Sequence, residues 1–362
     1  MNTRLPKLVL PFVLSMALLP VPQANAASTP PRYSSEARGI EDGDVVVNAQ
    51  EAAAMQAEAE AEMPVFRRLE REFHVPWYYL AAINQYEKGA HWRKGELAKA
   101  NTPFRVEIPP EKWSGFANPQ SDDNNPLTIQ MFGGIGLDGN GDKKAERLNP
   151  ADSMYTIAKV IAKEGGDEDA IRRCIWDFYR DGVIVDRVTG FAHIFQAAGT
   201  TNIGGNSFPI PRRYNYSYRS TWGDPRGWGG RRMHEGCDIF ANYGTPVMST
   251  AYGMVEVIGW NKFGGWRVGI RDLNNVYHYY AHLGGYEKGL KYGSLVKPGQ
   301  VIGYVGSSGY GKPGTSGKFA PHLHYGMYRE TGTREWAFDP TPHLRKWERE
   351  ARAKARKNRK RR

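Results

Sequence analysis

The first half of the chain carries apolar residues at helical spacing. From Pro64 the stretch VFRRLEREFHVPWYYLAAINQYEKG places large apolar side chains three or four positions apart, which indicates amphipathic helices. Proline kinks or breaks a helix interior, so Pro76 is predicted to divide this stretch into two helices. A further helix is predicted over NPADSMYTIAKVIAKEG, with Asn149 or Asp152 as its N-cap and Gly165 at its end. We therefore expect the first half to be mainly α.

The second half changes to short apolar runs separated by turn residues. Of the 41 glycines, 26 fall between positions 201 and 350, beside runs such as TPVMSTAYGMVEVIGW, GWRVGIRD and NVYHYYAHL. This composition is typical of an all-β domain. The stretch AAGTTNIGGNSFPIPRR has the small, Gly and Pro content of a linker, with a boundary near Phe208. A chain of 362 residues is thus expected to form two domains, at 63–197 and 207–344, joined by residues 198–206.

The chain begins with three successive segments: a basic one, an apolar one and one of small residues. Arg4 and Lys7 precede an apolar run from Leu8 to Val21, and the sequence Ala-Asn-Ala follows at 24–26. This order predicts a secretory signal peptide over 1–26 and a secreted or cell-envelope protein. A membrane anchor is the alternative, but a span needs about 20 apolar residues and this run is shorter. Residues 27–62, rich in Ala, Glu and Ser, are predicted to be a spacer, either helical or disordered.

Positive charge is concentrated at the C-terminus. The net charge is +11, and residues 345–362 hold eleven Lys or Arg against two Glu, or +9, which leaves +2 for the rest of the chain. Such a basic tail is expected to be solvated and disordered, with anionic wall polymers or a membrane surface as its partner. The export signal disfavours nucleic acid as a partner. Cys174 and Cys237 are the two cysteines, which excludes a disulfide framework and leaves either one inter-domain bridge or two free thiols.

Histidines form three groups in the predicted β domain, at HEGCD (234–238), HYYAH (278–282) and HLH (322–324). On a strand, residues two apart project to one face, so His322 and His324 would point together. Gly236 would let the chain bend so that His234 and Asp238 converge on one ion. Two histidines and one carboxylate with an open fourth position suit a catalytic zinc ion. Each pair alone is a weak signal, but the three groups together indicate a metal site.

The order of these groups resembles a known family. The segments HEGCDIFANYGTPVMST, NNVYHYYAHL, VKPGQVIGYVGSSG and PHLHYGMY look like the lysostaphin and LytM type of peptidoglycan metalloendopeptidases. The resemblance implies Zn²⁺ bound by His234, Asp238 and His324, with His282 and His322 as catalytic histidines that do not bind the metal. It also implies an antiparallel, barrel-like all-β domain with an open groove. The tryptophans of this domain would either line the groove or belong to the core: Trp222, Trp228, Trp260 and Trp266.

The two catalytic histidines differ in their expected roles. A neutral histidine can accept a proton from an attacking water, and His282 is the candidate for this general base. His322 would stabilise the developing oxyanion, although the two could exchange these roles. His278 is expected on the same strand face as His282 but roughly 13 Å away, as a cleft-wall or structural residue. Cys237 would face away from Asp238 and is left out of the site.

The stretch 63–197 is similar to lysozyme-like lytic transglycosylases. The similarity lies in FHVPWYYLAAINQYEKG, PLTIQMFGGIGLDGNGDKKAERLNPADSMYTIAKVIAKEGG and DAIRRCIWDFYRDGVIVDRV. It implies Glu87 as a general acid that burial keeps protonated, and Gln130 at the family's glutamine. Lys88 departs from the pattern and would keep Glu87 ionised, and Phe178-Tyr179 stands where Tyr-Asn is usual. An active muramidase and a non-catalytic glycan-binding module therefore both remain open.

The sequence DGNGD, from Asp138 to Asp142, copies the start of a calcium-binding loop. Asn149 stands where such a loop has its bidentate Glu, which favours a plain turn over a calcium site. No function is built on this segment.

These motifs predict a zinc-dependent endopeptidase that hydrolyses peptide bonds in bacterial cell-wall peptidoglycan. The run GWN-FGGWRVGIRD-NN-YHYYAHL looks like the subgroup that cleaves the L-Ala to D-Glu bond. Glycan-strand cleavage by the N-terminal domain would be a second activity. The alternative is a non-catalytic wall-binding or hydrolase-activating protein of the same fold. Such proteins typically lack one or more of the zinc ligands, and none is missing from this sequence.

Overall fold

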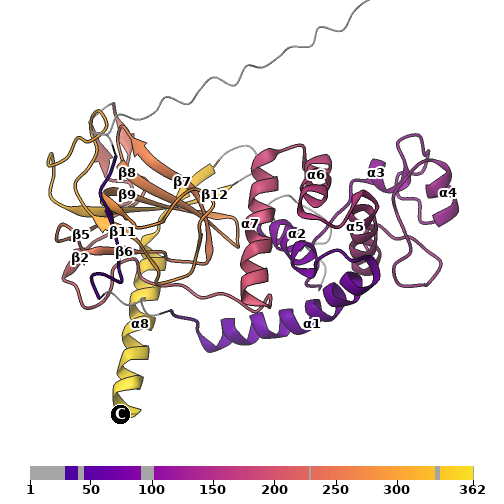
Figure 1. The fold of residues 1–362 in the computed structure, drawn as a ribbon, viewed down its shortest axis with the longest axis horizontal. Helices are drawn as coiled ribbons and strands as arrows, with labels where there is room; N and C mark the ends of the chain where they lie inside the picture. Colours follow the sequence, from indigo (N-terminus) through magenta and orange to yellow (C-terminus); the bar gives the residue numbers. More distant parts are fainter. Residues whose placement is uncertain (1–28, 40–44, 91–101, 228–229, 331–334, 362) are drawn as a thin grey trace, which may run out of the picture.

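The computed structural model describes residues 29–39, 45–90, 102–227, 230–330 and 335–361. Figure 1 shows a helical part beside a part built around one large β-sheet. The predicted signal peptide, residues 1–26, lies outside the described residues. None of the described helices is long and apolar enough to cross a membrane.

The helical part comprises seven helices within the described residues: α1 (Ala49–Phe73), α2 (Trp77–Gly89), α3 (Pro110–Ser114), α4 (Pro126–Met131), α5 (Pro150–Glu164), α6 (Glu168–Tyr179) and α7 (Gly182–Ala198). The predicted break at Pro76 is confirmed, because His74 turns the chain with a φ of 57° before α2 begins. The helix predicted from Asn149 is confirmed as α5. The Asn149 side chain accepts a hydrogen bond from the backbone N–H of Ala151, and Gly165 caps the other end.

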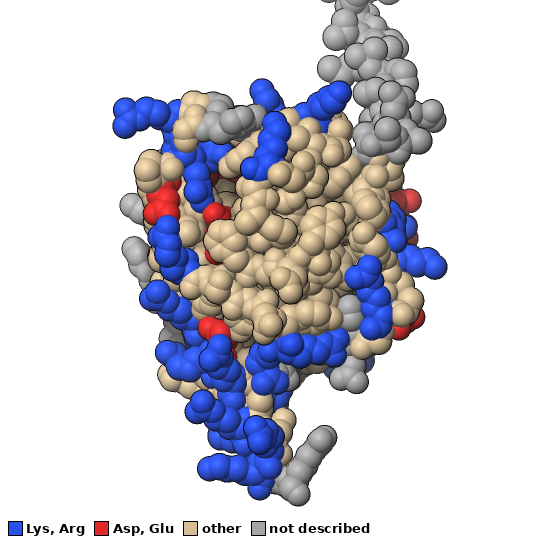
Figure 2. All heavy atoms as spheres, turned by 90° about the vertical axis from the view of Figure 1, so that its left-hand side faces the viewer, with Lys and Arg blue, Asp and Glu red and all other residues tan. Residues whose placement is uncertain are grey.

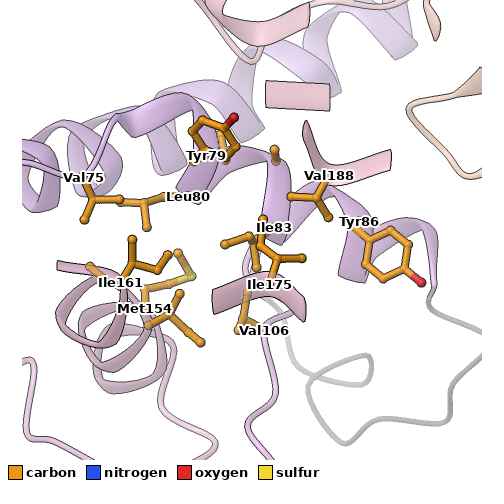
Figure 3. Close-up of a cluster of buried hydrophobic side chains, with 14 of the residues drawn as sticks. Val75, Tyr79, Leu80, Ile83, Tyr86, Val106, Met154, Ile161, Ile175 and Val188 are labelled. Carbon is orange, nitrogen blue, oxygen red and sulfur yellow. The ribbon is translucent and has the colours of Figure 1, made fainter. Parts of the chain in front are cut away.

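Helix α2 lies at the centre of this part. Its apolar residues share one buried cluster with residues of α5, α6 and α7, and some of the side chains of this cluster are drawn in Figure 3. Tyr79, Leu80, Ile83 and Tyr86 of α2 are all buried. A helix with so little exposed surface can form only when neighbouring helices surround it, so the seven helices share one core. The prediction of a mainly helical first half is confirmed. A lysozyme-like arrangement of these helices stays a prediction.

The residues predicted to be a spacer are part of the fold. Helix α1 begins at Ala49 and continues without interruption through the expected boundary at residue 62. Glu62 is buried and forms an ion pair with Lys88 of α2. Strand β1 (Arg32–Tyr33) adds to the C-terminal sheet in parallel with Tyr286 and Glu287. The described residues of this segment therefore contact both parts: β1 pairs with the sheet, and Glu62 pairs with Lys88 of α2.

The second part contains the large sheet, in the order β10-β7-β8-β9-β12-β5-β2. The strands, with the short hairpin β3–β4, are β2 (Tyr216–Tyr218), β3 (Pro225–Arg226), β4 (Arg232–Met233), β5 (Cys237–Ala241), β6 (Pro246–Met248), β7 (Gly253–Asn261), β8 (Gly265–Asp272), β9 (Val276–Glu287), β10 (Leu295–Val296), β11 (Val301–Val305), β12 (His322–Glu330) and β13 (Glu335–Phe338). All pairs except that of β1 with β9 are antiparallel. The predicted antiparallel β domain is confirmed.

Strand β9 contains a bulge that reverses its side-chain alternation. Tyr280 of β9 pairs with Val268 of β8, and Leu283 of β9 pairs with Trp266 of β8. Two residues therefore lie between these pairs on β9 and only one on β8, which is a bulge. Within this bulge His282 has a φ of 62°. His278 consequently points into the core, whereas His282 lines the opposite, open face. The prediction that these two histidines share a strand face is wrong, because it assumed uninterrupted alternation.

The basic tail is a helix, not a disordered segment. Helix α8 (Thr341–Arg361) begins inside the second part, where Leu344, Trp347 and Ala351 are buried in the core of the sheet. Its last turns project from the molecule and are exposed. Figure 2 shows Lys and Arg side chains gathered on this projection, at the lower end of the view. The prediction of disorder missed three apolar positions at helical spacing that anchor the helix.

Helix α7 connects the helical part to the sheet. Arg187 of α7 pairs with Glu256 of β7 and Glu330 of β12. At Gly190 a Cβ atom would lie 2.5 Å from the sulfur of Met254, so a larger residue there would have to displace the Met254 side chain. The two parts are therefore in close contact through charged and apolar groups.

Candidate active site

Three of the predicted site residues meet at one point on the open face of the sheet. Asp238 of β5 and His324 of β12 are direct partners in the strand register, and His234 lies just before β5. His234 Nε2 lies 2.8 Å from His324 Nδ1 and 3.1 Å from Asp238 Oδ1. His324 Nδ1 lies 3.2 Å from Asp238 Oδ1. These residues form a group of side chains that could hold a metal ion.

The three atoms fit a zinc ion. Ligands at about 2.0–2.2 Å around a tetrahedral zinc are about 3.3–3.6 Å from one another, close to the observed separations. The His234 ring is oriented by its Nδ1, which donates to the carbonyl oxygen of Thr221 at 2.7 Å and leaves Nε2 facing the group. Gly236 leaves room for this cluster, since a Cβ there would lie 2.6 Å from His324 Cε1.

The electrostatics of the three residues also suit a cation. Burial acts to raise the pKa of Asp238, but hydrogen bonds to His234 and His324 outweigh it and hold the pKa well below the ordinary aspartate range. Burial lowers the pKa of His324. An ionised carboxylate and a neutral imidazole are the forms that bind zinc. The chemistry of these side chains therefore agrees with their geometry.

The two further histidines of the prediction lie beside this group. The ring centroids of His282 and His322 are 4.8 Å apart. His282 Nδ1 lies 2.7 Å from the carbonyl oxygen of Ser308, and His322 Nδ1 lies 2.8 Å from that of Ala320. A carbonyl oxygen can only accept, so each Nδ1 carries the proton and each Nε2 has a free lone pair. Burial lowers the pKa of His282 to about 3 and also lowers that of His322, so both are neutral at pH 7.

A groove of about 800 Å³ runs from these histidines along the sheet. Its floor is made of tyrosines on β9 and β12: Tyr277, Tyr279 and Tyr328. Two of the rings lie over glycines. A Cβ at Gly264 would lie 2.1 Å from the hydroxyl of Tyr279, and one at Gly269 would lie 2.0 Å from that of Tyr277. Glycine on β8 and on the turn before it thus leaves room for the tyrosine hydroxyls of the floor.

Of the two alternatives for the tryptophans, a place in the groove lining does not hold for those that the structure describes. Trp260 and Trp266 pack against each other with ring centroids 5.1 Å apart, and neither lines the groove. Trp222 does not line it either, and Trp228 lies outside the described residues. The sequence gives the number and positions of the aromatic residues but does not show on which face of a strand each one lies. The feature of the sequence that could have indicated the groove lining is the pair of tyrosines at alternate positions of NVYHYY, Tyr277 and Tyr279.

Arginines of the groove were not identified from the sequence. Arg226, in the β3–β4 hairpin, donates to Asp238 Oδ2 at 2.6 Å and so holds the oxygen that faces away from the histidines. Arg232, Arg267 and Arg271 also line the groove. Isolated arginines outside any motif carry no sequence signal for a site, and only the strand pairing brings them together.

Two other predicted residues in this part are structural. His278 is buried, with Nε2 3.0 Å from Asp272 Oδ2 and Nδ1 2.7 Å from the hydroxyl of Tyr325. This places it among the structural residues rather than on the cleft wall. Cys237 is buried and directs its sulfur to the carbonyl oxygen of Arg219, away from the metal-binding group. Cys174 is also buried, and both thiols are free, so no bridge joins the two parts.

Glu87 lies in a separate cavity of about 200 Å³ in the helical part. Its walls are largely apolar, and Glu87 Oε1 accepts a hydrogen bond from the Tyr179 hydroxyl at 2.5 Å. Lys88 points elsewhere and pairs with Glu62 and Glu58, so the expected Lys88 contact with Glu87 is replaced by these. Gln130 is exposed and does not line this cavity. The structure therefore does not bring Glu87 and Gln130 together.

The loop from Asp138 to Asp142 is a turn stabilised by its own side chains. Asp138 accepts hydrogen bonds from the backbone N–H groups of Asn140, Gly141 and Lys143. These contacts use both carboxylate oxygens in the way that Asx turns do. The plain turn, which the sequence favoured over a calcium site, agrees with this geometry.

An antiparallel sheet that presents two histidines and an aspartate around one point, with two neutral histidines beside them, has the site of a zinc hydrolase. A family model described as peptidase family M23 matches residues 232–340. The L-Ala–D-Glu endopeptidase of Bacillus subtilis is 54% identical over 287 residues, which cover 79% of this chain and 88% of that protein. The chain belongs to peptidase family M23, a family of zinc metallopeptidases.

Other relatives match the sheet-containing part alone. Lysostaphin of Staphylococcus simulans is 37% identical over 115 residues, which cover 31% of this chain and 22% of lysostaphin. The chain thus spans about a fifth of the length of that relative. The solved catalytic domain of the same lysostaphin is 34% identical, covers 37% of this chain and 93% of that chain, and aligns with a TM-score of 0.30.

Proposed function

We propose that this protein is a zinc-dependent endopeptidase that hydrolyses the L-Ala to D-Glu bond in the peptide stems of bacterial cell-wall peptidoglycan. The observation that carries the proposal is the similarity to an L-Ala–D-Glu endopeptidase over 79% of the chain, together with a complete set of site side chains. The long shared region includes the helical part, so the similarity is not limited to the sheet.

In this proposal His234, Asp238 and His324 hold the zinc ion. Bound zinc supplies Lewis acidity, which polarises the scissile carbonyl and makes an attacking water more acidic. His282 Nε2 accepts the proton of that water, because Nδ1 is occupied by Ser308 and burial keeps the ring neutral. His322 Nε2 can donate to a developing oxyanion only when the ring is protonated. Asp238 Oδ1, 3.7 Å away, acts to raise the pKa of His322, but burial outweighs it, so the ring is neutral at rest and must gain a proton before it can take this role.

The test is digestion of purified peptidoglycan followed by mass spectrometry of the products. Cleavage of the L-Ala to D-Glu bond releases stem peptides that begin with glutamate and leaves L-Ala on the glycan. Activity should be lost to a chelator and restored by zinc. Products cut only at a crosslink, or activity that a chelator leaves intact, would refute the proposal.

The alternative is a non-catalytic wall-binding protein that activates a separate hydrolase. It is less favoured because the metal-binding group and both further histidines are present and face one groove. The same digestion separates the two. A binding protein would co-sediment with walls and release no peptides, and its His282→Ala variant would behave like the wild type.

A second activity, cleavage of glycan strands, is proposed for the cavity around Glu87. Its support is the position of a carboxyl group among apolar walls, the kind of environment that keeps a general acid protonated. The hydrogen bond that Glu87 accepts from Tyr179 acts in the opposite sense, since it favours the ionised form. Anhydro-muropeptides in the digest that disappear in a Glu87→Gln variant would support this activity. Their absence from the wild-type digest would exclude it.

We also propose two domains, at 63–197 and 207–344, with a linker at 198–206, and export through the signal peptide at 1–26. The division is supported by two separate apolar clusters, of which one lies almost wholly in α1–α7 and the other in the sheet and α8. Export is supported by the amino-terminal pattern and by the location of the proposed substrate. Amino-terminal sequencing of the protein from the culture medium or cell wall should begin at Ala27.

A further inference from the structure

The proposed substrate carries a charge that the groove should recognise. A glutamyl residue has two carboxyl groups, and a linear peptide stem continues through only one of them. The other is a free carboxylate one residue beyond the scissile bond. This inference rests on the proposed L-Ala to D-Glu cleavage. Recognition of this carboxylate requires a cationic side chain in the groove, at about the length of one peptide residue from His282.

Four arginines line the groove, and three of them are already engaged. Arg226 is bound to Asp238 Oδ2 at 2.6 Å. Arg271 is buried and pairs with both Glu256 and Glu335. Arg232 is exposed on the β3–β4 hairpin and stacks on Phe263, with its Cζ 5.0 Å from the ring centroid. Arg226 and Arg271 are held by carboxylates and so offer little attraction to another one. Arg232 is exposed, where solvent screens its charge.

Arg267 differs from the other three. In the described part of the chain no carboxylate forms an ion pair with it, and its Nε is buried without a hydrogen-bond partner. Buried donors are nearly always satisfied in native proteins, so an unpaired one inside a substrate groove marks a place where a ligand oxygen is missing. The guanidinium group is also well suited to bind a carboxylate with two parallel hydrogen bonds.

The position of Arg267 matches the position of the charge. It lies on β8 between Trp266 and Val268, whose partners on β9 are Leu283 and Tyr280. Arg267 is therefore opposite the bulge that carries His282. Paired antiparallel strands have Cα atoms about 4.5–5.5 Å apart, which is close to the length of one peptide residue. Its side chain lies on the groove face next to Tyr279, on whose pKa its positive charge acts against the effect of burial.

We infer that Arg267 binds the free carboxylate of the D-glutamyl residue and so makes the enzyme selective for stems in which this carboxylate is not amidated. Arg267 is a specificity residue in this account, not a part of the proton-transfer machinery. It positions the glutamyl residue so that the preceding carbonyl faces His282 and the metal-binding group. The aromatic floor beside it supplies apolar contact but no charge.

The experiment uses two synthetic stem peptides that differ in one group. Both contain N-acyl-L-Ala-γ-D-Glu followed by a diamino acid. One has a free α-carboxylate on the D-Glu and the other has a carboxamide. For the wild-type protein with zinc, kcat/KM should be about 10- to 100-fold higher for the carboxylate peptide, the range expected for a charged hydrogen bond. Equal kcat/KM values for the two peptides would overturn the inference while leaving the proposed cleavage intact.

Variants identify the residue responsible. Arg267→Gln should lower kcat/KM for the carboxylate peptide by about 10- to 100-fold, lower that for the amide much less, and bring the ratio close to one. Arg267→Lys should keep part of the preference, because it keeps the charge. Arg213→Gln, at an exposed arginine outside the groove, is the matched control and should keep the full ratio.

Other outcomes overturn the inference or its premise. An equal loss on both peptides with Arg267→Gln, or loss of the preference with Arg232→Gln instead, would show that Arg267 does not select the carboxylate. Zinc content and melting temperature of each variant show whether it is folded, and the wild-type comparison of the two peptides does not depend on any variant. If the wild-type protein cuts neither peptide after L-Ala but cuts whole peptidoglycan elsewhere, the proposed bond specificity fails, and the inference fails with it.

Discussion

His324 Nδ1 and Asp238 Oδ1 lie 3.2 Å apart because their residues are directly paired across β12 and β5. Two residues separated by 86 positions in sequence are thus held in one place by the backbone ladder of the sheet. With His234 they form the proposed zinc site. The side chains therefore need little rearrangement to bind the ion.

The first prediction concerns zinc removal. Because zinc binds only the folded site, adding it to chelator-treated protein should raise the melting temperature by mass action. His324→Ala removes one of three ligands, so this rise should disappear and peptidase activity should be lost. Differential scanning fluorimetry with and without zinc measures the effect. His193→Ala, at a partly exposed histidine paired with Glu168 in the helical part, is the control and should respond to zinc like the wild type.

The second prediction separates catalysis from metal binding. His282 is not one of the three residues of the metal-binding group, so His282→Ala should keep its zinc. Loss of a general base typically lowers the rate by about 10²- to 10⁴-fold, and we expect kcat to fall within this range. Zinc content by atomic emission and peptide release from walls are the two measurements. A zinc-loaded variant as active as the wild type would remove His282 from the mechanism.

The third prediction concerns pH. Burial lowers the pKa values of His282, His322 and His324, that of His282 to about 3. At pH values between these lowered pKa values and the ordinary histidine pKa, the unfolded chain therefore binds more protons than the folded protein. Stability therefore rises with pH in this window and is lost as the pH falls through it. Each such group contributes up to about 1.4 kcal/mol per pH unit.

Urea unfolding of the zinc-free protein at pH values from 4 to 7 measures this dependence. His282→Gln cannot titrate, so its free energy of unfolding should fall less steeply with acid than that of the wild type. Identical slopes for the two proteins would show that His282 is not held neutral by burial.

The fourth prediction concerns the contact between the two parts of the molecule. Arg187 is buried and pairs with Glu256 at 2.7 Å and with Glu330. Arg187→Met would leave two partly buried carboxylates without this buried partner and should cost about 3–5 kcal/mol in the free energy of unfolding. Asp177→Asn, at the exposed ion pair with Arg180, should cost no more than about 1 kcal/mol. Similar losses for the two variants would mean that the interface ion pair is not stabilising.

The fifth prediction concerns the projecting end of α8. Removal of residues 356–362 takes away exposed basic residues and leaves the buried Leu344, Trp347 and Ala351 in place, so the melting temperature should not change. If anionic wall polymers are the partner of this end, binding to teichoic-acid-containing walls should weaken. The difference should vanish at high salt because the interaction is screened. Co-sedimentation of both forms at low and high ionic strength tests this, and equal binding at low salt would contradict it.

The sequence by itself determined the two kinds of secondary structure and most of the proposed site. Helical and strand periodicities are local properties, so α2, α5 and the antiparallel strands could be predicted from them. The five site residues could be named because they occur in short motifs whose members lie within a few positions of one another. The limits of those elements were less well predicted. Helix α1 and helix α8 extend into segments expected to be spacer and tail, because packing of a few apolar residues outweighs composition.

Only the tertiary structure decided which face of the sheet each side chain occupies. One extra residue in β9 places His282 in the groove and His278 in the core, and no alternation pattern reveals a bulge before the strands pair. The same pairing brings Arg267 opposite His282 and lays tyrosines, not tryptophans, along the groove. Strand register is a non-local property, set by the combined burial of many side chains. The ligands could therefore be predicted from the motifs, whereas the surroundings that select a substrate could not.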